Sequence, residues 1–253
     1  MITGEPVSDL RSADDLVKEI QENYQAVQDR IVQAARSVGR QPAQVRLMVV
    51  TKGHHLDVVQ AALAAGARLL GENYVEEAVD KMQALAGETE IEWHMIGHVQ
   101  SRKADLVSQH FAWVHSVDSL KLARRLDRFT GESGRRLPVL LECNVSQEES
   151  KSGWKAWDES GWKVLANEIA PILELPALEV RGLMTMPPFF TDPEDARPYF
   201  QKLRRLQAYL QECFPQVSWD ELSMGMSGDF VVAVQEGATI VRVGTAILGE
   251  RTG

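Results

Sequence analysis

The chain is poor in the residues that mark secreted, metal-binding and membrane-spanning proteins. Its 253 residues include two cysteines, Cys143 and Cys213, which lie far apart. They provide neither a disulfide framework nor a metal-ligand spacing, so a reduced, cytoplasmic setting is predicted. No apolar run is long enough to span a membrane. The segment MITGEPVSDLRSADDLVKEI lacks the apolar centre of a signal peptide, so none is expected.

Basic charge is also scarce. Lysine and arginine number 27 against 36 acidic residues, which gives a formal net charge of −9. Binding to nucleic acid or to an anionic membrane needs a concentrated basic face, so neither partner is predicted. Aromatic residues make up 7% of the chain, but hydrophobic residues make up 44% and charged residues 25%. That balance is typical of a globular domain.

Short apolar runs alternate with helical patterns along the whole chain. A first amphipathic helix is predicted over residues 13–38. Strands are then predicted at residues 45–52, 68–73, 91–97, 112–118, 136–145, 178–186, 221–227 and 239–249. Helical patterns follow all but the last, at residues 56–66, 74–87, 101–110, 119–134, 162–173, 193–213 and 228–237.

This alternation predicts a parallel sheet with right-handed crossovers, and eight units at this length predict a (β/α)₈ TIM barrel. An open doubly wound sheet would carry a Gly-rich turn after its first strand, and no G-x-G-x-x-G occurs there. The first helix is expected to take the place of the missing eighth one. Residues 1–253 are interpreted as a single domain.

Lys52 stands at the carboxyl end of the first predicted strand, in VVTKGHH. Active sites of such barrels lie at the carboxyl ends of the strands. Partial burial there would lower the pKa of the lysine and leave a free amine, a nucleophile that forms a Schiff base with an aldehyde. Taken alone, Lys52 fits equally well a lysine that extends into solvent.

The carboxyl ends of the last two strands have the composition of a phosphate site. LSMGMSGDF places Ser227 and Gly228 before a helix, and VRVGTAILG places Gly244 and Thr245 beside them. Glycines let a phosphate approach backbone N–H groups, and the loops after strands seven and eight often build this site in barrels. Ser227 is expected to cap the helix that follows it and to donate its hydroxyl.

Arg242 lies two residues before Gly244 and therefore points into the barrel. A buried guanidinium needs an acceptor. A carboxylate such as that of Glu72 would provide a structural one, and a cofactor ring nitrogen a functional one. The amine, the phosphate site and the arginine together suggest pyridoxal 5′-phosphate.

Several ordered blocks resemble the pyridoxal phosphate homeostasis protein family, which is related to the alanine racemase N-terminal barrel. The blocks include VVTKGHH, GENYVEEAVDK, IEWHMIGHVQSRKADLV, NVSQEESKSGW, VRGLMTMPP, LSMGMSGDF and VRVGTAILGER, and the resemblance covers nearly the whole chain. It implies a cytoplasmic, single-domain barrel that binds pyridoxal phosphate as a Schiff base and buffers or delivers it to apo-enzymes.

The resemblance also implies the residues of the site. Lys52 would carry the cofactor, Arg242 would approach its ring nitrogen and Asn73 would lie beside it. Met226, Ser227, Gly244 and Thr245 would hold its phosphate. One departure is Thr51-Lys52-Gly53, where many relatives read Ser-Lys-Thr.

The resemblance implies no catalytic turnover, catalytic residue or metal. Related racemases take a second base from an additional β domain, and this sequence ends soon after the eighth predicted strand. An arginine at the ring nitrogen also weakens the electron sink of the cofactor. We therefore expect a non-catalytic binding protein.

Three other functions remain open from the sequence. A pyridoxal phosphate-dependent amino-acid racemase would need a second base, such as His94. A serine hydrolase is suggested by Gly225-Met-Ser-Gly-Asp229, which departs from the G-x-S-x-G elbow at its last position. A barrel enzyme acting on a phosphorylated metabolite would leave Lys52 and Arg242 unexplained. The loop at residues 146–154 is either a lid over the barrel mouth or a solvated connection.

Overall fold

The fold is taken from a computed structural model that describes residues 13–148 and 150–251. The prediction of a single domain over residues 1–253 extends beyond this range and stays a prediction. Most of the segment inspected for a signal peptide also lies outside the described residues. Within the described ranges, no helix combines the length and the hydropathy needed to cross a bilayer.

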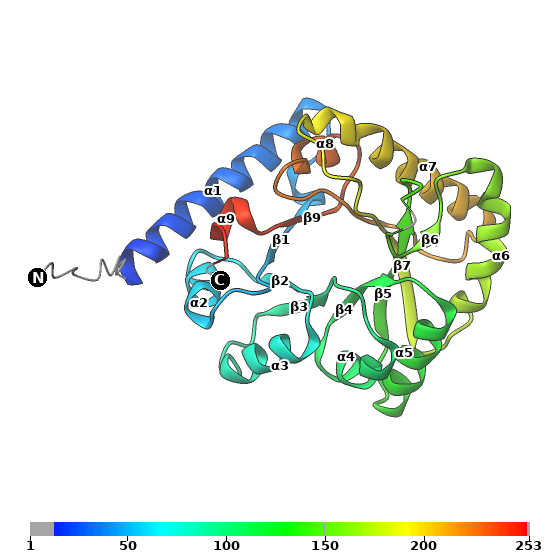
Figure 1. Cartoon of the computed structure of the whole chain (residues 1–253), viewed down its shortest axis with the longest axis horizontal. Coiled ribbons are helices and arrows are strands. Elements are labelled where there is room, and N and C mark those ends of the chain that lie inside the picture. Colours follow the sequence, from blue (N-terminus) through cyan, green and yellow to red (C-terminus); the bar gives the residue numbers. More distant parts are fainter. Residues whose placement is uncertain (1–12, 149, 252–253) are drawn as a thin grey trace, which may run out of the picture.

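Eight parallel strands close into a barrel, as predicted (Figure 1). They are β1 (Arg46–Val50), β2 (Leu69–Glu72), β3 (Glu92–Met95), β4 (Trp113–Val117), β5 (Leu137–Asn144), β7 (Leu178–Met184), β8 (Glu221–Ser223) and β9 (Ile240–Val243). Around the barrel they follow the order β4-β3-β2-β1-β9-β8-β7-β5, and pairing of β4 with β5 completes the ring. The first and last strands are therefore neighbours, with Val49 opposite Val243.

Helices surround the barrel (Figure 1). They are α1 (Ala13–Ser37), α2 (Leu56–Ala64), α3 (Val75–Ala84), α4 (Ala104–His110), α5 (Leu120–Glu132), α6 (Trp162–Leu173), α7 (Arg197–Cys213), α8 (Phe230–Gln235) and α9 (Thr245–Leu248). Short 3₁₀ turns cover Pro42–Gln44, Ser101–Lys103, Glu159–Gly161 and Pro193–Ala196. Helix α1 packs against α2, α8 and α9, so it occupies the place expected for the eighth helix.

The structure moves the ends of the last two predicted strands and adds one short strand. The predicted seventh strand ends at Ser223, because residues 224–229 form the loop that leads to α8. The predicted eighth strand ends at Val243, and the apolar run that continues it is helix α9. A short strand, β6 (Trp154–Lys155), was missed; it pairs with the end of β5 outside the barrel order, so the loop at residues 146–154 returns to the sheet.

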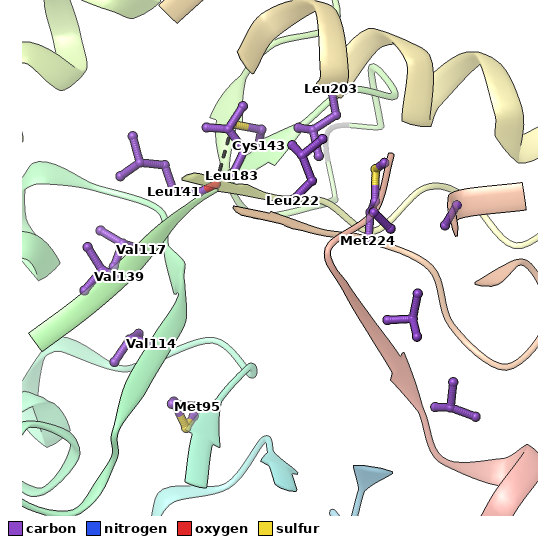
Figure 2. Close-up of a cluster of buried hydrophobic side chains, with 14 of the residues drawn as sticks. Met95, Val114, Val117, Val139, Leu141, Cys143, Leu183, Leu203, Leu222 and Met224 are labelled. Atoms are coloured by element: carbon purple, nitrogen blue, oxygen red, sulfur yellow. Dashed lines mark hydrogen bonds between the residues drawn. The ribbon is translucent and has the colours of Figure 1, made fainter. Parts of the chain in front are cut away.

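Apolar side chains fill the space between the strands and the helices. Figure 2 shows part of this core, where Leu203 of α7 lies near Leu183 and Leu222 of neighbouring strands. The barrel interior is different: a small apolar cluster of Met48, Leu69, Ile96 and Ile240 fills part of it. Strands buried on both faces read as continuous apolar runs, which is why the sequence reveals them so clearly.

Candidate functional site

One pocket opens at the carboxyl ends of the strands and has a volume of about 300 Å³. It is formed mainly by the segments that follow β1, β2, β7, β8 and β9. All seven residues predicted for the site line it: Lys52, Asn73, Met226, Ser227, Arg242, Gly244 and Thr245. The volume is at the lower end of the range for small-molecule sites.

The turn that carries Lys52 is held from both sides. The Thr51 hydroxyl donates to Glu72 Oε1 at 2.7 Å, and Lys81 Nζ donates to the Thr51 carbonyl at 2.7 Å. On the other side, the Gly53 N–H donates to Glu77 Oε1 at 2.6 Å. Side chains of β2 and α3 therefore fix the backbone immediately before and after Lys52.

Lys81 and Glu72 form the buried centre of this support. Lys81 Nζ lies 2.8 Å from Glu72 Oε1 and 2.6 Å from Glu77 Oε1, and the Glu72 side chain is fully buried. Burial raises the pKa of Glu72, and the hydrogen bond and charge of Lys81 oppose that rise. Glu72 was one of two acceptors considered for Arg242, and the structure does not support it, because the hydrogen bonds of Glu72 are to Lys81 and Thr51.

Lys52 is half-buried at the pocket wall. Burial is the main cause that lowers the pKa of its amine; the positive charges of Arg251 and Arg242 lower it further, and Glu72 acts in the opposite direction. No hydrogen bond or ion pair of Lys52 is found within residues 13–148 and 150–251. A lysine in this state has a larger fraction of free amine at neutral pH.

Gly53 allows Arg251 to pack beside the lysine. Its φ of +70° is a left-handed conformation that glycine adopts readily. A Cβ at this position would lie 2.9 Å from Arg251 Cδ. Arg251 is therefore a further cation at the pocket, beside Lys52 and Arg242, and sequence reasoning missed it.

Arg242 is buried without a carboxylate bonded to it. Its Nη1 donates to Ser223 Oγ at 2.7 Å, and its Nη2 donates to the Thr185 carbonyl at 2.9 Å. Both acceptors are neutral, and none of the ion pairs found among the described residues includes Arg242. Burial lowers the pKa of the guanidinium to about 10, so it stays charged at neutral pH.

Ser227 joins the loops that follow β8 and β9. Its Oγ accepts the Ala246 N–H of α9 at 3.3 Å. The expected cap on the following helix is wrong, because α8 begins only at Phe230 and Asp229 precedes it. Asp229 instead accepts the Met226 N–H at 2.6 Å and so closes the loop on itself.

Several backbone N–H groups of residues that line the pocket have no protein acceptor among the described residues. Within the described ranges, no acceptor is found for the N–H of Ser227 or of Gly228. Thr245 is the first residue of α9, so its N–H has no acceptor inside the helix. Gly244 brings these groups close to β1, because a Cβ there would lie 3.2 Å from the Val50 carbonyl oxygen.

His94, considered from the sequence as a second base, lies outside the pocket lining, and so does His98. His94 is fully buried and hydrogen-bonded to His115 and Glu92. His98 is exposed and pairs with Asp118 at 3.0 Å. His94 is therefore not placed to serve as a second base, which removes the residue proposed for a racemase.

Sequence reasoning missed most of one wall. The segment after β7 contributes apolar side chains, among them an exposed Phe189. The residues missed there are Pro188, Phe189, Phe190, Pro193 and Ala196, and the polar residues Asp229 and Arg251 were missed as well. The run MTMPPFF at the end of a barrel strand was the available signal for the apolar part.

Comparison with known proteins shows that this barrel belongs to the class of alanine racemase N-terminal domains. The family model described as alanine racemase, N-terminal domain, matches residues 19–252. The alanine racemase of Streptomyces coelicolor A3(2) has the same fold, with a TM-score of 0.68 at 17% identity. This chain covers 58% of that racemase, so the likeness is one of fold alone.

Closer relatives narrow the assignment. The pyridoxal phosphate homeostasis protein of Vibrio alginolyticus is 40% identical over 239 residues, covering 92% of this chain and 97% of that protein. The protein of that name from Escherichia coli K12 is 39% identical over 240 residues, covering 93% and 98%. PipY of Synechococcus elongatus PCC7942, solved with PLP bound, is 37% identical with a TM-score of 0.78, covering 91% of this chain and all of PipY. The chain belongs to the pyridoxal phosphate homeostasis protein family.

Proposed function

We propose that this protein binds pyridoxal 5′-phosphate in the pocket and serves as a carrier that buffers the cofactor or delivers it. Three features that lie together in one pocket support this function. They are an amine with a lowered pKa on Lys52, a buried guanidinium on Arg242, and free N–H groups at Ser227 and Gly228. The relatives named pyridoxal phosphate homeostasis protein, and PipY with PLP bound, support the same ligand.

The residues of the pocket fit the cofactor part by part. When bound, pyridoxal phosphate supplies an aldehyde that condenses with an amine, and Lys52 is the amine in the pocket. The loop around Met226 and Ser227, with Gly244 and Thr245, would hold the phosphate through N–H and hydroxyl donors. Arg242 would donate to the ring nitrogen, and Asn73, the residue after β2, would contact the ring.

We further propose that the bound cofactor is not applied to catalytic turnover. An arginine whose pKa stays near 10 does not surrender its proton to a ring nitrogen at neutral pH, which weakens the cofactor as an electron sink. Racemisation would need a second base opposite Lys52, and no tyrosine that could serve as one is among the described residues that line the pocket. His54 lines it, but it follows β1 two residues after Lys52 and so comes from the same turn.

We also propose a cellular role for the protein, which is delivery of the cofactor to apo-enzymes. Delivery to apo-enzymes in the cytoplasm fits an exposed apolar wall beside the pocket, because a receiving protein can cover Phe189. Incubation of the loaded protein with an apo-enzyme that needs the cofactor tests this role. The expected result is a faster gain of enzyme activity than with an equal concentration of free cofactor in the presence of a cofactor-trapping amine.

The ligand itself is tested by absorbance and by chemical trapping. The protein loaded with pyridoxal phosphate should show a visible band, and borohydride should fix the cofactor on the peptide that contains Lys52. Lys52→Ala should lack both signals, whereas the control Lys155→Ala, at an exposed lysine, should keep them. Absence of a band with excess cofactor would favour another phosphorylated ligand. Interconversion of D- and L-alanine by the loaded protein would favour the racemase.

The hydrolase alternative loses its chemical basis. The Ser227 hydroxyl oxygen accepts a backbone N–H, and no histidine of the described residues is hydrogen-bonded to it. A nucleophilic serine needs such a base. Lack of labelling by a serine-directed acylating probe is the expected outcome.

A further inference from the structure

A continuous chain of hydrogen-bonded side chains runs through the barrel interior from the pocket. Arg242 Nη1 lies 2.7 Å from Ser223 Oγ, which lies 2.9 Å from His115 Nδ1. His115 Nε2 lies 2.8 Å from His94 Nδ1, and His94 Nε2 lies 2.8 Å from Glu92 Oε1. We call this chain the barrel relay; its members are Arg242, Ser223, His115, His94 and Glu92.

The barrel relay crosses the barrel and connects its two ends. It joins β8 and β9 to β3 and β4, and these two pairs of strands are separated by two other strands on each side of the ring. Arg242 lines the pocket at the carboxyl ends, whereas Glu92 is the first residue of β3, at the amino ends. The Glu92 side chain is 42% exposed, and the members between are buried.

The chemistry of the two ends fixes the direction of every bond. An ionised Glu92 only accepts, so His94 Nε2 must carry a hydrogen. A neutral His94 then has a bare Nδ1, which requires a donor on His115 Nε2. A neutral His115 in turn has a bare Nδ1, which accepts from the Ser223 hydroxyl. Ser223 is left with lone pairs for Arg242, which only donates.

The surroundings keep both imidazoles neutral. Burial is the main cause that lowers the pKa of His94; Glu92 and Glu221 raise it, and Arg46 lowers it further. Trp113 stacks on the His94 ring, with centroids 5.5 Å apart. Burial also lowers the pKa of His115, and the positive charges of Arg242 and Arg46 act in the same direction.

The direction of the barrel relay has a consequence for the guanidinium. Each link presents its lone pair toward Arg242 and its hydrogen toward Glu92, so the dipoles align to stabilise the positive charge. The counter-charge stays at the far end of the barrel. Arg242 is therefore held by neutral acceptors, and its charge remains available to a ligand in the pocket.

We propose that the barrel relay positions Arg242 for the ring of the bound cofactor and couples that contact to protonation at the amino end of the barrel. Ser223, His115 and His94 are positioning residues in this proposal. It rests on the proposed function, because the contact that it controls is with pyridoxal phosphate.

Acid should reverse the direction of the barrel relay. A proton on His94 makes Nδ1 a donor, so His115 must shift its own hydrogen to Nδ1, and the Ser223 hydroxyl loses its acceptor. A positive charge also enters the interior and repels Arg242. The other charged groups that face Arg242 are Asp229 and Glu142, which favour its charge, and Lys52. The contact with the ring should weaken on the acid side of the ordinary histidine pKa of 6.5.

The direction is tested without any cofactor. NMR of ¹⁵N-labelled histidine reports the tautomer of each ring at neutral pH. The expected result is hydrogen on Nε2 of both His94 and His115. Hydrogen on Nδ1 of His115 would overturn the proposal, since the fixed direction is its foundation.

The coupling is tested by a change at the end remote from the pocket. Glu92→Gln keeps a hydrogen-bonding group but removes the ionised acceptor that fixes the direction. It also removes a group that raises the pKa of His94. We expect pyridoxal phosphate to bind on the order of fivefold more weakly. We also expect the acid limb of the binding profile to move to lower pH.

The matched control is Glu221→Gln, which removes a carboxylate at the same end of the barrel but outside the barrel relay. Glu221 pairs with Arg46 at 2.9 Å. It should leave the histidine tautomers and the neutral-pH affinity unchanged. Equal affinity and equal pH profiles in Glu92→Gln and in the unaltered protein, with cofactor bound to both, would overturn the coupling alone. Failure of the unaltered protein to bind cofactor would overturn both the proposed function and the coupling. The histidine tautomers would still show whether the hydrogen bonds of the barrel relay have the proposed direction.

Discussion

Removal of the Lys81 ammonium should destabilise the fold and loosen the turn that carries Lys52. Lys81→Met keeps much of the side-chain volume but leaves Glu72 fully buried without its cation. Loss of one partner from a buried ion pair costs about 3–5 kcal/mol of unfolding free energy. The lost bond to the Thr51 carbonyl adds to the effect at the site, so the affinity for pyridoxal phosphate should fall as well.

The destabilisation should depend on pH in a defined direction. Burial already raises the pKa of Glu72 above 4.5, and the loss of Lys81 removes the main opposing cause. A carboxyl group whose folded pKa lies above its unfolded pKa binds more protons when folded, so stability falls as pH rises between the two values. The difference between Lys81→Met and the unaltered protein should therefore be smaller at pH 5 than at pH 8.

Urea unfolding followed by tryptophan fluorescence measures these free energies. Lys81→Met/Glu72→Gln should recover part of the loss, because the uncompensated charge is gone. Arg128→Ala, which breaks an exposed pair with Glu132 at 2.9 Å, is the control and should cost under about 1 kcal/mol. A loss below that size for Lys81→Met, unchanged between pH 5 and pH 8, would refute the reasoning.

Two further predictions concern charges around the pocket and the barrel. Arg251→Gln removes a cation that lowers the pKa of Lys52, so that pKa should rise and the rate of cofactor association at neutral pH should fall. Stopped-flow absorbance across pH 6–10 measures the association rate. A rate profile that does not shift along the pH axis would count against a role for Arg251. Glu142 is buried on β5 and its pKa is raised to about 7, mainly by burial. Its folded pKa exceeds its unfolded one, so it should reduce stability on the order of 3 kcal/mol as pH rises from about 4.5 to above 7. Glu142→Gln should flatten the stability profile over that window, and an equally steep profile would contradict the assignment.

The sequence was sufficient for the order of the barrel strands and of the helices between them, and for seven of the residues that line the pocket. The strands of the barrel are buried on both faces, so each appears as an apolar run, and the residue after each run lies at the same end of the barrel. Lys52, Asn73 and Gly244 could be brought together on that rule alone. Arg242 could be assigned to the inner face from its spacing to Gly244.

What the sequence did not reveal depends on contacts between distant segments. Ser227 bonds to Ala246 rather than to its own helix, since the exact start of α8 decides which groups need a cap. Lys81 lies in the helical pattern at residues 74–87, and that pattern does not predict that its side chain reaches the turn after β1. The hydrogen bond between His115 and Ser223 joins strands on different sides of the barrel, and no local sequence pattern predicts a contact of this kind.

The pairing of the first strand with the last has a consequence for how the protein matures. Lys52 follows β1, whereas Arg242, Gly244 and Thr245 belong to β9 and to the turn that begins α9. A nascent chain therefore exposes its reactive amine long before the groups that would hold the rest of the ligand have been synthesised. Ligand retention requires ring closure, so a prematurely terminated chain that lacks β9 should release cofactor that the finished protein keeps. Because β9 closes the ring, ligand retention shows that synthesis has proceeded through this strand.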